Sequence, residues 1–182
     1  KTLYRDMEKS MKEYLEALKF IRDNGVTTSN RTGIGTQSVF GYQMRFNLKD
    51  GFPAVDTKKL AWKSVVSELL WMLEGSTDER RLAEILYDKP REQLIDKKTI
   101  WTANADAQGK QLGYINTDLI KELGPVYGRQ WRNFGKATSR SSGSIYGVDQ
   151  ISNIIKQITE EPDSRRLIIS AWNPNQIKDM AL

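Results

Sequence analysis

One stretch constrains the fold of this chain more than any other: PDSRRLIISAWN, residues 162–173. The apolar run 167–169 follows a Pro-Asp turn signal, and this pattern predicts a buried strand. Two adjacent arginines, Arg165 and Arg166, stand at the start of that strand. Because each guanidinium presents a planar fork of donors, such a pair on a rigid strand favours a fixed site for a phosphate or a carboxylate. An ion pair with Asp163 or with another carboxylate at the strand end is the alternative, and on this stretch alone it is the more ordinary interpretation.

The composition limits what such a site can contain. The 182 residues are enough for a domain with its own core, so we expect a single domain over residues 1–182. Cysteine and histidine are both absent from the sequence, which excludes disulfides, thiolate ligands and the commonest general base, and we expect no metal site. The net charge of +5 suits an anionic small molecule as well as a nucleic acid. Because no apolar run has the length of a membrane span and no signal peptide is recognisable, we expect a cytoplasmic protein without a membrane partner.

Apolar residues at helical spacing predict several helices. The first is expected to bury one face and to stop at Asn24-Gly25. The second is the most apolar, and we expect a central helix that is covered on most sides and ends at Gly75. Ser76 and Glu79 have the spacing of a capping box for the third. The expected helices are residues 4–22, 56–75, 76–87 and one from Val148 to near Glu161-Pro162, with a further helix beginning at Pro174.

Strict alternation of apolar and polar residues over 40–48 predicts a half-buried strand. The polar loop before it, 27–36, holds Gly33 and Gly35, which allow the backbone to approach a ligand closely. Arg31 in this loop could add a third guanidinium to an anion site, and a plain hairpin-like turn is the alternative. Helices and strands are mixed without a regular βαβ order, which favours an α+β fold.

Some features leave a structural and a functional interpretation open. Glu68 has apolar neighbours in the central segment, so it lies either on an exposed stripe or in a cavity where it can relay protons. Trp101 is either packed in the core or the wall of an aromatic pocket. Residues 122–134 have the composition of a loop shaped around a ligand. Residues 136–144 are typical of a mobile surface insertion.

Several blocks resemble the thymidylate synthase family in their order along the chain: RTGIGT, GFPAVDTKK, SELLWMLEGST, TIW, ELGPVYGRQWRNF, GVDQI and PDSRRLIISAWNP. Together they extend over nearly the whole sequence. The LGY spacer before ELGPVYG is similar to the T-even bacteriophage branch. So is Asn104, where many members have a second tryptophan. The resemblance to this branch leaves open whether the protein is phage-encoded.

The resemblance implies an α+β fold with a twisted mixed sheet flanked by helices, and a homodimer formed through that sheet. It implies the reductive methylation of dUMP to dTMP. The cosubstrate would be 5,10-methylenetetrahydrofolate, which gives both the carbon and the hydride. The implied partners are dUMP, the folate and a second subunit, and binding of the protein's own mRNA is a further, lesser expectation.

By the same resemblance, Arg31 corresponds to an arginine that binds the nucleotide phosphate. Arg165 and Arg166 correspond to a pair that reaches the phosphate bound by the other subunit, so an anion site replaces the ion pair as their expected role. Tyr127 corresponds to a residue on the floor of the cavity. Glu68 corresponds to the carboxylate that manages protons on the pyrimidine through bound water.

The folate contacts implied by the resemblance come from other segments. Ile100 and Trp101 correspond to the wall that faces the folate, and Lys58 corresponds to a contact with its glutamate tail. The family commonly has aspartate where this chain has Thr102. The contacts around that position therefore depart from the family pattern.

The family's nucleophilic cysteine lies in a Pro-Cys-His motif just after the block that reads IKDMAL here, residues 177–182. Because a thiolate must add to the pyrimidine before carbon transfer, we expect these residues to be the N-terminal portion of a longer enzyme, inactive by themselves. An apolar edge is expected at residues 167–172. Two alternatives stay open: a pyrimidine deoxynucleotide hydroxymethylase, in which water completes the transfer, and a non-catalytic nucleotide- or RNA-binding fragment. Lysines and arginines scattered among acidic residues disfavour RNA binding.

Overall fold

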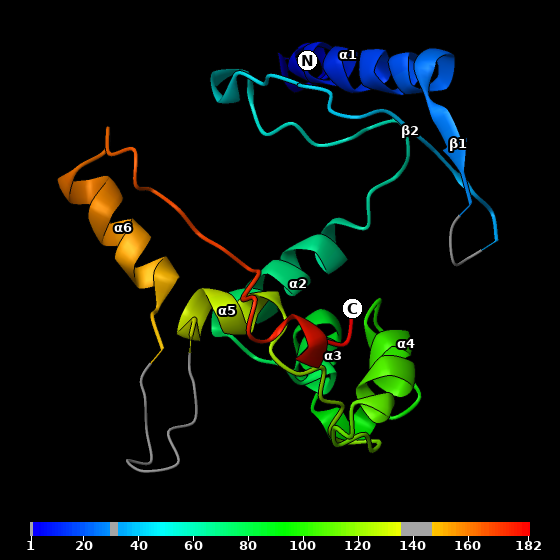
Figure 1. The fold of residues 1–182 in the computed structure, drawn as a ribbon, viewed down its shortest axis with the longest axis vertical. Coiled ribbons are helices and arrows are strands. Elements are labelled where there is room, and N and C mark those ends of the chain that lie inside the picture. The colour runs from blue at the N-terminus through cyan, green and yellow to red at the C-terminus, as the bar shows by residue number, and fades with distance from the viewer. Residues whose placement is uncertain (1, 30–32, 136–146) are drawn as a thin grey trace. The chain divides into compact units, whose positions relative to one another are not determined.

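The computed structural model describes residues 2–29, 33–135 and 147–182, with the side chains of the first helix from Lys12 onward. The chain divides into two compact units, Lys1–Ala61 and Trp62–Leu182 (Figure 1). In the described part of the chain, no helix is both long enough and apolar enough to cross a membrane.

The first unit begins with α1 (Thr2–Asn24), which confirms the predicted helix and its stop. The N–H of Gly25 donates to the carbonyl oxygen of Ile21 at 2.7 Å. A Cβ on Gly25 would lie 2.4 Å from that oxygen, so the stop requires glycine. The expected buried face is narrow, because Ala17 is buried but Leu18 is exposed.

A small hairpin follows α1. Its strands are β1 (Val26–Thr28) and β2 (Thr36–Ser38), which pair antiparallel with Val26 opposite Ser38. The hairpin-like turn considered for this region is therefore present. Arg31 lies outside the described residues, as does the insertion expected over 136–144.

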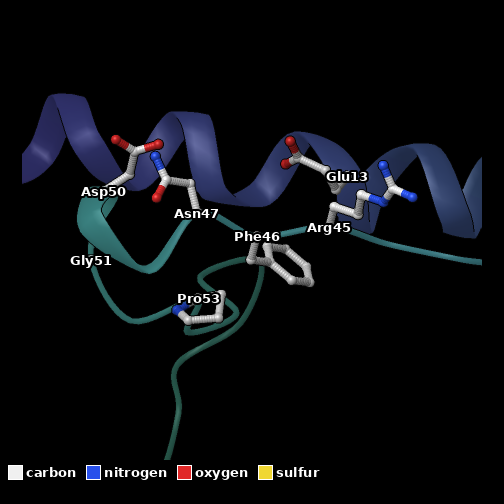
Figure 2. Close-up of a pocket in the computed structure, with 7 residues that line it drawn as sticks. All are labelled: Glu13, Arg45, Phe46, Asn47, Asp50, Gly51 and Pro53. Atoms are coloured by element: carbon white, nitrogen blue, oxygen red, sulfur yellow. The ribbon is translucent and has the colours of Figure 1, made fainter. Parts of the chain in front are cut away.

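The half-buried strand predicted over residues 40–48 is wrong. Phe40 and Leu48 are exposed, and the sheet of the described residues consists of β1 and β2 alone. An extended segment becomes a strand only when a neighbour accepts and donates its backbone hydrogen bonds, and this segment has none. It leads instead to the 3₁₀ turn η1 (Leu48–Asp50). Figure 2 shows the hollow of about 330 Å³ that this segment forms beside α1, lined by Glu13, Arg45, Phe46, Asn47, Asp50, Gly51 and Pro53.

The second unit has an apolar core between three helices: α2 (Trp62–Glu74), α3 (Glu79–Tyr87) and α5 (Tyr127–Asn133). Gly128 brings α5 close to α2, since a Cβ there would lie 2.4 Å from the carbonyl oxygen of Met72. The N–H of Ala181 donates to the carbonyl oxygen of Leu123 at 3.0 Å and holds the last residues against this core. The buried residues of the core are Trp71, Leu82, Trp101, Ala105, Leu123, Val126, Met180 and Ala181.

The predicted central helix is confirmed as α2, and Gly75 ends it with a φ of 71°. The expected burial on most sides is wrong. Ser67 and Trp71 are its buried residues, whereas Leu69 and Leu70 are exposed. The helices of the same unit cover one face of α2 and leave the other face open.

The third helix begins differently from the prediction. Asp78, not Ser76, is the N-cap of α3, and its Oδ1 accepts the N–H of Arg80 at 3.0 Å. The predicted capping box is therefore wrong. Glu79 is the first residue of the helix, and its carboxylate pairs with the Arg80 guanidinium, a stronger partner than a backbone N–H.

Residues 122–134 are more regular than predicted, because α5 takes up their second half. The turns that connect α3 to this segment are η2 (Arg91–Gln93), α4 (Thr102–Asn104) and the π-helical turn η3 (Ala105–Gly109). The helix predicted from Val148 to near Glu161-Pro162 is confirmed as α6 (Gln150–Glu160), and Asp149 caps it by accepting the N–H of Ser152 at 3.0 Å.

The buried strand predicted over residues 167–169 is wrong. In Figure 1 the chain from α6 back to the core is an extended trace without an arrow, and Ile168 is 70% exposed. The backbone of this segment is hydrogen-bonded by the Gln150 side chain and not by a neighbouring strand. The Gln150 amide accepts the N–H of Ser170 at 2.9 Å and donates to the Ser170 carbonyl oxygen at 2.8 Å. One side-chain amide satisfies the backbone of one residue, which is too little to form a sheet. The helix expected from Pro174 is the short 3₁₀ turn η4 (Ile177–Asp179).

The α+β class is confirmed, since the chain has helices together with a small antiparallel sheet. Within the described residues the sheet is the two-stranded pair in the first unit rather than the broad mixed sheet expected from the resemblance.

Candidate functional site

A hydrogen bond between Glu68 and Trp101 defines the candidate site. The Trp101 indole Nε1–H donates to Glu68 Oε1 at 2.6 Å, and the two residues are 33 positions apart in the sequence. Glu68 is half-buried on α2 and Trp101 is buried just before α4. A hydrogen bond to an ionised carboxylate is stronger than one between neutral groups. The described residues give Oε2 no partner, so this oxygen can receive a ligand or a water.

Aromatic rings extend from this hydrogen bond across the second unit. Trp71 and Trp101 have ring centroids 5.8 Å apart, and Trp101 and Tyr127 are 6.0 Å apart with an edge-to-face geometry. Tyr127 meets Trp172 at 5.7 Å in the same geometry. These separations are favourable for aromatic pairs. They bring together α2, the turn before α4, α5 and the extended segment after α6, and three of the predicted site residues, Glu68, Trp101 and Tyr127, belong to this group.

A buried ion pair lies close behind Trp101. Glu79 and Arg80 are both fully buried, and Arg80 Nε and Nη2 lie 2.6 and 2.7 Å from the two oxygens of the Glu79 carboxylate. Burial by itself would raise the pKa of Glu79, but hydrogen bonds from Arg80 and two threonines outweigh it. The pKa of this carboxyl therefore lies below its usual value, and the pair stays charged inside the unit.

The predicted folate residues are placed differently from one another. Ile100 is 79% exposed although its neighbour Trp101 is buried. Lys58 is exposed and belongs to the first unit.

Arg165 and Arg166 are exposed. In the described part of the chain neither guanidinium forms an ion pair, so the ion pair with Asp163 that the sequence left open is absent from this structure. The backbone N–H of Arg166 donates to Ser164 Oγ at 3.3 Å, which shapes the turn before them. Both side chains are open to an anion.

A group of buried amides joins α5 to the segment after Trp172. Gln130 Nε2 donates to the carbonyl oxygen of Pro125 and to Gln176 Oε1, both at 3.0 Å. Asn173 Nδ2 donates to the same Gln176 oxygen at 3.0 Å. Because Asn173 follows Trp172 directly, these bonds fix the end of the aromatic row.

Several residues of this site are not indicated by the sequence. The pattern around Trp71 indicates only an apolar helix, and Glu79 has only the spacing of a capping box. Trp172 belongs to the stretch 162–173, where nothing gives it a role. The adjacent opposite charges of Glu79 and Arg80 were a visible signal of an ion pair, although nothing in their spacing indicates burial. Among the described residues, no three acidic side chains come together as a metal ion would require.

The chain matches the family model described as thymidylate synthase over residues 12–182. It is 47% identical over 172 residues to the thymidylate synthase of Enterobacteria phage T4, with 94% of this chain and 54% of that protein covered. It is 46% identical over 172 residues to a thymidylate synthase of Coxiella burnetii, with the same coverage.

The structure agrees with these sequence matches. The crystal structure of thymidylate synthase from T4 phage superimposes with a TM-score of 0.78 at 47% sequence identity, covering 94% of this chain and 54% of that one. The chain spans about half the length of the curated relatives that it matches. It belongs to the thymidylate synthase family.

Proposed function

We propose that this chain acts as part of an enzyme that converts dUMP to dTMP with 5,10-methylenetetrahydrofolate as cosubstrate. Membership of the family supports the reaction. The observation that carries the proposal is the Glu68 carboxylate held at 2.6 Å by the indole of Trp101, which lies between Trp71 and Tyr127 in the aromatic row. The family match is continuous over both units, which supports a single domain.

Glu68 is the proposed proton carrier. One of its oxygens is held by Trp101, and the other has no hydrogen-bond partner among the described residues. A carboxylate fixed in this way can exchange protons with a water on the pyrimidine, which is general acid–base catalysis by a positioned side chain. These 182 residues contain no cysteine, so the steps that we assign to them are binding, orientation and proton transfer, and not nucleophilic attack.

Ile100 and Trp101 are proposed to form the wall that faces the folate. Trp101 is only 9% exposed, so the exposed Ile100 supplies most of the accessible apolar area of this wall. Tyr127 would form the floor. Lys58, an exposed cation, is proposed to hold the folate glutamate tail by charge attraction.

Arg165 and Arg166 are proposed to bind the phosphate of dUMP in a second copy of the chain, with Arg31 binding the phosphate in its own copy. Two exposed guanidiniums that form no ion pair with the described residues support this role. A planar fork of donors matches phosphate oxygens. A homodimer with shared sites follows from the proposal.

Tritium release from dUMP labelled at carbon 5, with methylenetetrahydrofolate and the natural gene product, tests the function. We expect turnover and a methylated product. Glu68→Gln should lower kcat by about 10²–10⁴-fold, because the amide cannot carry the proton. Glu74→Gln, an exposed carboxylate one turn and a half along α2, is the matched control and should keep full activity. Absence of turnover, or a product with the mass of a hydroxymethyl nucleotide, would refute the proposal.

A further inference from the structure

The Arg80 guanidinium is completely satisfied inside the second unit. Besides its two bonds to Glu79, Nη1 donates to the carbonyl oxygens of Leu94 at 2.9 Å and Lys97 at 3.0 Å. Nη2 donates to the Lys97 oxygen at 3.0 Å. Every N–H of the guanidinium therefore has an acceptor. Arg80 ties the turn that precedes Trp101 to the start of α3.

Two threonine hydroxyls connect this ion pair to Trp101. Thr99 Oγ1 and Thr102 Oγ1 each donate to Glu79 Oε1 at 2.6 Å. Thr99 Oγ1 in turn accepts the backbone N–H of Trp101 at 3.2 Å, and Thr102 Oγ1 accepts the N–H of Thr99 at 2.8 Å. Because a hydroxyl has a single proton, the carboxylate fixes the direction of both hydroxyls and leaves their lone pairs for the backbone.

The chain of bonds is continuous from Arg80 to the candidate site. It passes from Arg80 to Glu79, then to Thr99, then to the backbone of Trp101, whose indole holds Glu68. A buried ion pair usually adds less stability than apolar residues of the same size, so its presence beside the site is better explained by the geometry that it imposes.

We propose that Thr99, oriented by the buried Glu79–Arg80 ion pair, is a positioning residue that sets the Trp101 indole and thereby the Glu68 carboxylate. The consequence for catalysis rests on the proposed function, whereas the placement of Trp101 does not. A merely structural role is the alternative. In that case the ion pair would only hold the turn at residues 94–99, and the position of the Trp101 indole would not depend on the Thr99 hydroxyl.

The indole N–H resonance of Trp101 tests the placement directly. It is recorded on the natural gene product labelled with ¹⁵N-tryptophan and assigned by its loss in Trp101→Phe. Thr99→Val keeps the shape of the side chain but removes the hydroxyl, so we expect this resonance to move toward the position of a free indole. Thr99→Ser restores the hydroxyl and should restore the resonance.

Thr77→Val is the matched control, because Thr77 Oγ1 also donates to a carboxylate, that of Glu122, at 2.5 Å in the same unit but without a link to Trp101. Thr77→Val should leave the resonance in place.

With Thr99→Val, kcat should fall by about ten- to a hundredfold, as expected for a misplaced catalytic group. An unmoved resonance in folded Thr99→Val would overturn the proposal. So would a Thr99→Ser resonance displaced to the free-indole position, which decides the matter even if Thr99→Val does not fold. A wild-type protein without thymidylate synthesis would refute the proposed function while the resonances still decide the role of Thr99.

Discussion

Two pairs of adjacent charged residues in the second unit have opposite surroundings. Glu79 and Arg80 are fully buried, and the unit supplies an acceptor for every N–H of the guanidinium. Arg165 and Arg166 are exposed, and the described residues give neither an ion pair. A cluster of charges therefore does not by itself mark a binding site. Charges that the fold satisfies are held in place and can orient other groups, whereas charges that the fold leaves open are accessible to a ligand.

The largest expected effect is the loss of the buried cation. Arg80→Met keeps an apolar stem but leaves the Glu79 carboxylate buried without its guanidinium, so the free energy of unfolding should fall by about 3–5 kcal/mol. Urea unfolding of the natural gene product, followed by tryptophan fluorescence, measures it. The double variant Glu79→Leu/Arg80→Met removes both charges and should lose less than the sum of the single variants. A loss below about 1 kcal/mol for Arg80→Met would contradict the claim that the buried Glu79 carboxylate needs the Arg80 guanidinium.

Removing the exposed pair, Arg165 and Arg166, should affect substrate binding and leave stability nearly unchanged. Arg165→Met/Arg166→Met should leave the free energy of unfolding within about 0.5 kcal/mol of the wild type, because neither side chain forms an ion pair within the described part of the chain. The KM for dUMP should rise by roughly ten- to a hundredfold, which corresponds to about 1.5–3 kcal/mol for a hydrogen bond to a charged group. Steady-state kinetics with varied dUMP would measure it. Lys156→Met, which removes an exposed cation of α6, is the control. A similar rise in KM for that variant would show that the effect comes from the loss of positive charge in general and not from these two arginines.

Much of the fold could be predicted wherever the signal is local. The periodic apolar residues of α1, α2 and α6 and the glycine stops after α1 and α2 identified these helices. Both strand predictions, over 40–48 and 167–169, failed because alternation or apolarity shows only that a segment can pair. Whether a neighbour is present is decided by the rest of the fold. The capping box at Ser76 failed for a related reason, since spacing cannot reveal that a guanidinium competes for the Glu79 carboxylate.

The candidate site could be predicted residue by residue but not as an arrangement. The roles of Glu68, Trp101 and Tyr127 came from the resemblance to a family, and the structure places these residues in one group. Their contact depends on the packing of helices that are distant in sequence. The hydrogen bond from the Trp101 backbone to Thr99 could not be predicted, because nothing in the sequence around Thr99 distinguishes it. The proposed role of Thr99 becomes visible only when the structure shows the buried Glu79 carboxylate beside it.

The smallest expected effect tests whether hydrogen-bond geometry or burial determines how much an arginine–carboxylate pair stabilises the fold. Arg81 follows Arg80 on α3 and also meets a carboxylate through two N–H groups, with Nε and Nη2 at 2.8 and 2.7 Å from the oxygens of Glu74. The side chains of Arg81 and Glu74 are 41% and 42% exposed, so water screens their attraction. Arg81→Met should therefore lower the free energy of unfolding by about 0.2–1 kcal/mol, several-fold less than Arg80→Met in the same urea series. If the two variants lost the same amount, hydrogen-bond geometry rather than burial would set the energy of these pairs, and the distinction between satisfied and open charges would no longer predict function.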